Sequence, residues 1–167
     1  MPFWLIGMMG AGKSVAGEAL AARLGVEFVD TDVVVVEIAG TPLPVIWEEL
    51  GEEHFRTLEQ IAIERAAVRR SAVVATGGGV VLHEPNVTTM RQSGSVVWLD
   101  ATPNTLALRI GILEGRPLLV TSDPLGRLVQ LDVVRRPLYE AAAHHRVGTD
   151  DMTISEVVDV LETMWTA

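Results

Sequence analysis

The feature that most restricts the possible folds is a glycine-rich run at residues 7–14, which reads GMMGAGKS. It matches the pattern GxxxxGK[ST] in full, in which glycines let successive backbone N–H groups converge on an anion in front of a helix N-terminus. The apolar run Phe3–Ile6 predicts a short buried strand before it, and the apolar spacing of Val15–Leu24 predicts a helix after it. This order favours an α/β fold with a phosphate-binding loop. The competing interpretation is an ordinary glycine-rich turn.

Lys13 is the only lysine among the 13 lysines and arginines of the chain, and it lies inside this pattern. A compact, flexible ammonium group can reach the β- and γ-phosphates of a nucleotide. The hydroxyl of Ser14 is placed to bind Mg²⁺. The motif therefore predicts a nucleotide and Mg²⁺ as ligands.

The composition predicts a single domain over residues 1–167. The net charge of −9 argues against nucleic-acid binding, and no stretch reaches 18 uncharged apolar residues, which argues against a membrane span. The absence of cysteine excludes a thiolate nucleophile and a disulfide framework. The N-terminus has no basic segment typical of a signal peptide, so we expect a cytoplasmic protein, and we expect it to be a monomer.

Strand-like and helix-like segments alternate along the whole chain. We expect strands at Phe3–Ile6, Glu27–Val29, Ala72–Ala75, Ser95–Leu99 and Arg146–Gly148. We expect helices at Lys13–Leu24, Asp32–Ala39, Leu43–Leu50, Glu52–Arg69, Pro85–Gln92, Pro103–Gly111, Asp123–His144 and Ser155–Trp165. This alternation predicts a parallel sheet with helices on both faces.

Two acidic residues, Asp30 and Asp32, end the second expected strand. Ligands of open α/β sheets bind at the carboxyl ends of the strands, so one carboxylate could lie near the metal and the other near an acceptor hydroxyl. The alternative is that Asp30 starts a turn and Asp32 caps the next helix.

Three glycines at 77–79 follow a buried strand, which suits a close approach of backbone to ligand but also suits a flexible turn. Guanidinium groups bind carboxylates and phosphates through two hydrogen bonds. The arginines considered for this role are Arg56, Arg109, Arg116, Arg135 and Arg136. Taken singly, each is more typical of a surface residue, and Arg56 would then pair with Glu52 or Glu59 on its own helix.

Other segments give weaker signals. Residues 111–124 contain two prolines and lack helical spacing, which favours a lid, although an ordinary connection between helices is the alternative. We expect all histidines and tryptophans to be structural, with His144 and His145 ending a helix where an imidazolium meets the macrodipole favourably.

These motifs together resemble the shikimate kinase family. The resemblance is carried, from residue 3 to 148, by GMMGAGKS at 7–14, FVDTD at 28–32, FRTLE at 55–59, GGG at 77–79, GRPLL at 115–119 and RRPLY at 135–139. It implies a three-layer P-loop kinase fold of the nucleoside-monophosphate-kinase type, with five parallel strands. It also implies ATP and Mg²⁺ as ligands and phosphorylation of the 3-hydroxyl of shikimate in aromatic amino-acid biosynthesis.

The resemblance also implies a role for individual residues. Catalysis would fall to Lys13, Asp32 and Arg116, with Asp32 as the base and Arg116 carried in by the lid at about 111–124. The nucleotide would be bound by Gly10, Ala11, Gly12, Lys13, Ser14, Val15, Arg109 and Arg116. Shikimate would be bound by Asp32, Arg56, Gly78, Gly79 and Arg135, with a substrate-binding subregion at about 32–60. Mg²⁺ would be held by Ser14 and, through water, by Asp30.

Two other functions stay open at the level of sequence. One is another small-molecule kinase of the same fold, such as a gluconate kinase, although that substrate gives no reason for paired carboxylate-binding arginines beside the triple glycine. The other is a nucleotide-binding module that has lost catalysis, although the chain retains each of the motif residues named above. Val15 stands where the family commonly has threonine, so a hydroxyl contact to the α-phosphate is lost while the backbone N–H remains.

Overall fold

The computed structural model describes residues 1–111 and 123–166, and its centre is one sheet of five parallel strands. The strands are β1 (Phe3–Ile6), β2 (Glu27–Asp30), β3 (Ala72–Ala75), β4 (Ser95–Asp100) and β5 (His145–Gly148). Their order is β2-β3-β1-β4-β5, so that Trp4 of β1 pairs with Val74 on one side and Val96 on the other. The central strands β1 and β3 are buried along their whole length, because helices cover both faces of a parallel sheet.

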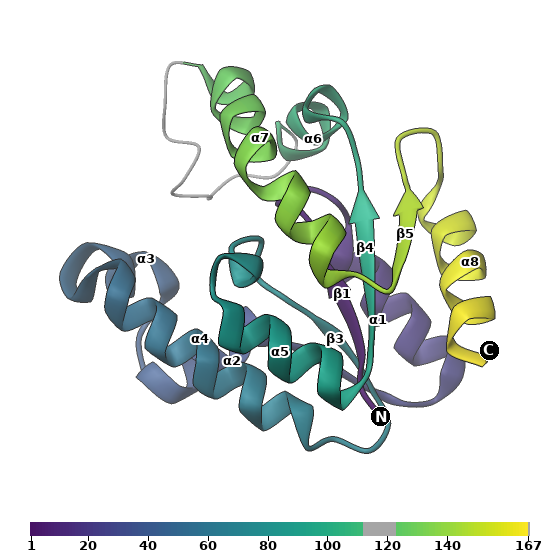
Figure 1. Cartoon of the computed structure of the whole chain (residues 1–167), viewed down its shortest axis with the longest axis horizontal. Coiled ribbons are helices and arrows are strands. Elements are labelled where there is room, and N and C mark those ends of the chain that lie inside the picture. The colour runs from purple at the N-terminus through teal and green to yellow at the C-terminus, as the bar shows by residue number, and fades with distance from the viewer. Residues whose placement is uncertain (112–122, 167) are drawn as a thin grey trace.

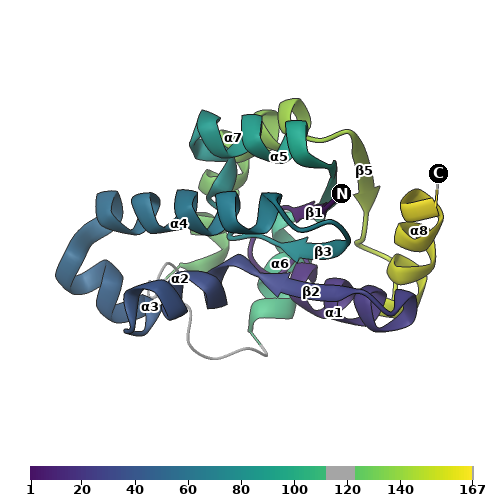
Figure 2. The same cartoon turned by 90° about the horizontal axis from the view of Figure 1, so that it is seen from below.

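Helices form a layer on each face of the sheet. The long helices are α1 (Lys13–Leu24), α4 (Gly51–Ala67), α5 (Glu84–Ser93), α7 (Pro124–Ala142) and α8 (Ile154–Thr166). The shorter elements are α2 (Thr31–Ala39), α3 (Leu43–Val45), the π-helical turn η1 (Ile46–Leu50), the 3₁₀ turn η2 (Val80–Leu82) and α6 (Pro103–Ile110). Helices α1 and α8 lie on one face, and α5 and α7 lie on the other (Figures 1 and 2). This arrangement confirms the predicted three-layer fold class.

A second, smaller apolar cluster lies beyond the sheet edge, where α2, α3, η1 and α4 meet (Figure 1). Its buried members are Val35, Ile46, Phe55, Leu58 and Ala62. The cluster fixes the N-terminal half of α4, which carries Arg56, within the subregion that the sequence assigns to substrate binding. Within the two described parts of the chain, no helix is long and apolar enough to cross a membrane.

Residues Leu43–Leu50 do not form the regular α-helix that the sequence predicts. The structure has only one short α-helical turn there, followed by the π-helical turn η1. Gly51, whose φ is 80°, donates its N–H to the carbonyl of Ile46, five residues back, and this bond closes the wider turn.

The predicted helical end at His144 and His145 is also wrong. Helix α7 ends at Ala142, and His145 begins β5. The backbone N–H of His144 donates to the carbonyl of Val96, and its Nδ1 accepts from the N–H of Val96 at 3.0 Å. Partial burial, with the nearby Arg91 and His145, lowers the pKa of His144. The side chain therefore acts as a neutral acceptor at the sheet edge, not as a cation at a helix end.

Candidate functional site

The glycine-rich run at 7–14 joins β1 to α1 and forms a loop at the carboxyl edge of the sheet. Gly10 has a φ of 79°, which a residue with a side chain rarely adopts, and a Cβ there would meet the side chain of Ile110. Lys13 is buried, and its Nζ donates to the carbonyls of Gly7 at 2.8 Å and Met8 at 2.9 Å. These bonds hold the ammonium group across the loop, where phosphate oxygens would meet it.

Ser14 and Asp30 come together beside this loop. The Ser14 hydroxyl donates to Oδ2 of Asp30 at 2.7 Å, and Oδ1 of Asp30 accepts from the N–H of Asp32 at 3.0 Å. Asp30, not Asp32, is thus the N-cap of α2. The alternative interpretation, in which Asp32 caps this helix, is therefore wrong.

The oxygen atoms of Ser14 and Asp30 fit Mg²⁺, which prefers hard oxygen ligands and keeps several waters. Within the described residues there is no group of three or more His, Cys, Asp or Glu side chains that could hold a metal ion by itself. A metal here would therefore complete its shell with water and nucleotide phosphates, as Mg²⁺ does in kinases.

Arg56 lies on α4 and faces the triple glycine. Its guanidinium pairs with Glu52 at 3.1 Å and with Glu59 at 2.9 Å, as the surface alternative expected. The side chain is nevertheless only 17% exposed, and it stacks against the rings of Trp47 and Phe55. A Cβ added to Gly79 would lie 2.6 Å from Nη2 of Arg56, so the glycine leaves room for this guanidinium.

Arg135 reaches the same place from α7. Arg135 is 5% exposed, and its Nη1 donates to the carbonyl of Gly78 at 3.2 Å. Its neighbour Arg136 points elsewhere, because it pairs with Asp132 and Asp100 at 2.9 and 3.0 Å. Of the two adjacent arginines, only Arg135 therefore reaches the triple glycine.

Two carboxylates border Gly77. A Cβ on this glycine would lie 3.0 Å from Oδ1 of Asp32 and 3.2 Å from Oε1 of Glu59. Glu59 is 1% exposed, and burial raises the pKa of its carboxyl, while the charge of Arg56 lowers it again in part. The sequence predicts Glu59 only as an ion-pair partner of Arg56 on the same helix. Its spacing of three residues from Arg56 is the one sign in the sequence that it lies near the site.

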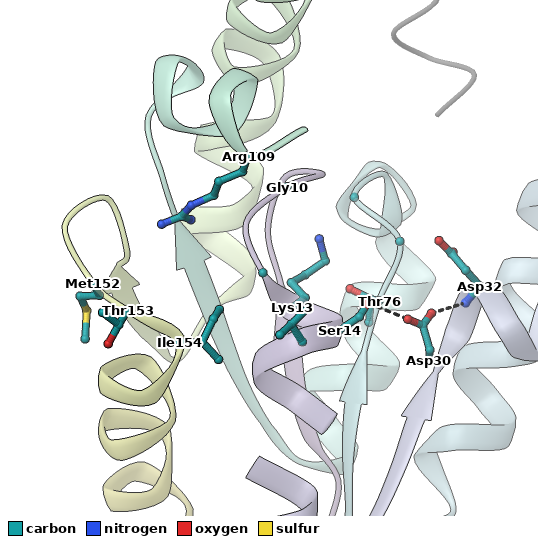
Figure 3. A pocket seen from close by; sticks show the side chains of 14 residues that line it. Gly10, Lys13, Ser14, Asp30, Asp32, Thr76, Arg109, Met152, Thr153 and Ile154 are labelled. Atoms are coloured by element: carbon teal, nitrogen blue, oxygen red, sulfur yellow. Dashed lines mark hydrogen bonds between the residues drawn. The ribbon is translucent and has the colours of Figure 1, made fainter. Parts of the chain in front are cut away.

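A cavity of about 420 Å³ extends from the phosphate loop, Asp30 and Asp32 to a region between α6 and the start of α8 (Figure 3). Arg109 of α6 lies on one side of that region, and residues 152–154 lie on the other. Arg109 is tied to Thr149, donating from Nη1 to the hydroxyl at 3.0 Å and from Nη2 to the backbone carbonyl. Residues that line the cavity are Gly10, Gly12, Lys13, Ser14, Val15, Asp30, Asp32, Thr76, Gly77, Gly78, Arg109, Met152, Thr153 and Ile154.

The structure thus brings together nearly all of the predicted site residues that it describes. Lys13, Ser14, Asp30, Asp32 and Arg109 line one cavity, while the remaining substrate-binding candidates gather at the triple glycine on its border. Arg116 and most of the predicted lid at 111–124 lie outside the described residues.

A parallel five-stranded sheet with a phosphate-binding loop at its carboxyl edge and a large adjoining cavity defines the class of P-loop nucleotide-binding proteins. The family model described as shikimate kinase matches residues 9–165. The chain belongs to the shikimate kinase family, and it is a kinase that uses ATP.

Individual relatives agree with this assignment. A shikimate kinase of Symbiobacterium thermophilum is 46% identical over 163 residues, covering 96% of this chain and 94% of that protein. One of Ralstonia nicotianae is 40% identical over 158 residues, covering 95% and 83%. The solved structure of shikimate kinase from Acinetobacter baumannii in complex with shikimate has a TM-score of 0.93 and 34% identity, covering 99% of this chain and 93% of that one. A gluconokinase from Sinorhizobium meliloti, with a TM-score of 0.61 and 20% identity, shares the fold alone.

Proposed function

We propose that this kinase transfers the γ-phosphoryl group of ATP to the 3-hydroxyl of shikimate, with Mg²⁺ bound beside the loop. The observation that carries the proposal is the convergence of Arg56 from α4 and Arg135 from α7 on the adjacent Gly79 and Gly78. Two guanidiniums beside one stretch of open backbone suit a small carboxylate. Gly78 also adjoins the phosphate loop, since a Cβ on it would lie 3.3 Å from the backbone nitrogen of Met9.

Arg56 and Arg135 would bind the shikimate carboxylate, helped by the backbone of Gly78 and Gly79. Asp32, on the border of the same cavity, would accept a hydrogen bond from a hydroxyl group of the substrate. An acidic group and two guanidiniums around a small polyol would fix which hydroxyl faces the phosphate loop. Orientation of this kind is a large part of catalysis in phosphoryl transfer.

The nucleotide would lie along the loop and α6. The backbone N–H groups of residues 10–15 and the ammonium of Lys13 would hold the phosphates, and Arg109 would lie against the base. Bound Mg²⁺ would neutralise part of the charge on the β- and γ-phosphate oxygens. Ser14 would bind the ion directly and Asp30 through water, which matches the hydrogen bond that already joins these two side chains.

In the reaction, Asp32 would orient the attacking hydroxyl and take its proton late, because the transition state is loose and requires little basicity early. Lys13 would stabilise charge on the transferring group. Arg116 would add a second cation there, as the family motif at 115–119 implies. The sequence also predicts that the enzyme acts as a cytoplasmic monomer, and light scattering of the purified chain tests the second part.

The experiment is a coupled ADP-release assay with ATP and Mg²⁺ and with shikimate, gluconate or no acceptor. We expect ADP release that depends on shikimate and a background rate in the other two reactions. Release with gluconate would instead support the sugar-acid kinase alternative. The same slow rate in all three reactions would contradict the proposal and favour a module that only binds nucleotide.

A further inference from the structure

The triple glycine has no side chains with which to fix its own conformation, and two side chains of α7 hold its middle residue, Gly78. The carbonyl of Gly78 accepts hydrogen bonds from the Tyr139 hydroxyl and from Nη1 of Arg135, the latter at 3.2 Å. Arg135 and Tyr139 are four residues apart, so they lie on one face of the helix. Both residues are buried, Tyr139 completely.

The two donors differ in what else they are needed for. Arg135 is the group that, under the function proposed above, binds the substrate carboxylate. A guanidinium has a rigid fork of donors, so turning this fork toward a carboxylate changes the N–H that is offered to Gly78. The Tyr139 hydroxyl is not among the groups assigned to the substrate, although it also interacts with the guanidinium of Arg135, whose charge partly opposes the effect of burial on the pKa of the phenol.

The surroundings keep Tyr139 in place as a donor. Its ring stacks on Trp98 with a centroid distance of 5.7 Å and an interplanar angle of 23°. Burial raises the pKa of the phenol, so the hydroxyl keeps its proton throughout the usual pH range. The ring is held by packing, and the hydroxyl is therefore aimed at the Gly78 carbonyl with little freedom to rotate away.

We propose that Tyr139 is a positioning residue for substrate binding, whose hydroxyl keeps the Gly78 carbonyl in place and so frees Arg135 to bind the substrate carboxylate. The proposal rests on the proposed function, because it needs Arg135 to bind substrate. Without the hydroxyl, Arg135 is the one donor that the described residues still offer to the carbonyl of Gly78, and the substrate must compete with that carbonyl for the guanidinium.

The test variant is Tyr139→Phe, which removes the hydroxyl and retains the ring on Trp98. We expect the KM for shikimate to rise about 5- to 10-fold, the factor that one buried hydrogen bond provides, while kcat and the KM for ATP change less than about twofold. The matched control is Leu128→Val on the same helix, a fully buried residue whose loss of one methylene lowers stability without touching the glycines. This control should lower the melting temperature and leave the KM for shikimate unchanged.

A second comparison tests the route through Arg135. In an Arg135→Ala background, Tyr139→Phe should raise the KM for shikimate by less than twofold, because no guanidinium remains to be freed. An unchanged KM for shikimate in the Tyr139→Phe variant, or the same rise in KM in both backgrounds, would overturn the positioning role of Tyr139. The proposed function would still stand if the wild type shows shikimate-dependent activity. A wild type without such activity would overturn both.

Discussion

Gly79→Ala is the substitution that tests the site geometry most directly. Gly79 has a φ of −94° and a ψ of 0°, values that alanine adopts without strain, so the backbone should tolerate the change. The new methyl group, however, would lie 2.6 Å from Nη2 and 2.7 Å from Nη1 of Arg56. These atoms end a flexible side chain, so the guanidinium should move while the fold stays intact.

The size of the movement sets the size of the effect. An ordinary contact needs at least 3.4 Å where the structure offers 2.6 Å, so Nη2 must retreat by about 0.8 Å. The ion pairs of Arg56 with Glu52 and Glu59 restrict how its guanidinium can retreat. A shift of this size misaligns a charged hydrogen bond worth about 1.5–3 kcal/mol, and its complete loss would weaken binding roughly 10- to 150-fold. We expect the KM for shikimate to rise about tenfold or more.

The measurement is steady-state ADP release with shikimate varied at saturating ATP, together with thermal unfolding of each variant. The control is Gly148→Ala, where an added Cβ has no heavy atom within 4 Å, so both KM values and stability should stay near those of the wild type. A folded Gly79→Ala enzyme whose KM for shikimate stays within about twofold of the wild type would refute the placement of Arg56 against the substrate. A matching rise in the KM for ATP would show a general disturbance of the cavity instead.

Three further predictions concern other parts of the chain. Lys13→Ala should lower turnover at least about 100-fold with the fold retained, and near-normal ADP release would remove this ammonium from the mechanism. Arg135→Ala should weaken shikimate binding by about 1.5–3 kcal/mol in calorimetry. Arg136→Ala, which loses ion pairs away from the glycines, should change the affinity for shikimate less than threefold. The opposite ranking would contradict the observed register of α7. Because the pKa of His144 is lowered in the folded state, its unfolded form takes up a proton first, and stability should fall as the pH drops below about 6.5 and through the folded pKa. The melting temperature of His144→Asn should therefore drop less between pH 7.5 and 5.5 than that of the wild type. An equal drop in both proteins, or an equally small drop in His145→Asn, would contradict the role of His144 in this pH dependence.

The sheet and the phosphate loop could be predicted because each signal is local. Strand β1, helix α1 and strand β3 have the bounds that apolar spacing predicts, since a continuous apolar run before a glycine-rich loop leaves few other solutions. The register of α7 followed from the motif at 135–139, and burial of Arg135 with exposure of Arg136 to acidic partners agrees with it.

The parts that sequence reasoning missed depend on contacts between distant segments. The end of α7 is fixed by pairing of His144 with Val96, about 50 residues earlier, which no helix-end signal reports. Tyr139 acts on a carbonyl 61 residues away, and an aromatic residue on a helix gives no sign of that partner. Glu59 looked like a surface partner of Arg56 because its burial comes from packing of α4 against neighbouring elements.

The cations of the site each have a resting partner in the absence of ligand. Lys13 bonds to carbonyls of its own loop, Arg56 to two glutamates and Arg135 to the carbonyl of Gly78. A buried cation without a partner would cost several kcal/mol, so these contacts allow a chain with a net charge of −9 to keep positive groups inside a cavity. Anionic ligands then exchange one set of partners for a stronger one, because charge-assisted bonds to phosphate and carboxylate exceed bonds to neutral carbonyls. The exchange is easiest where the resting partner is a neutral carbonyl, as for Lys13 and Arg135. It is hardest for Arg56, whose resting partners are carboxylates, so selectivity for the substrate carboxylate should depend most on how Glu52 and Glu59 hold that guanidinium.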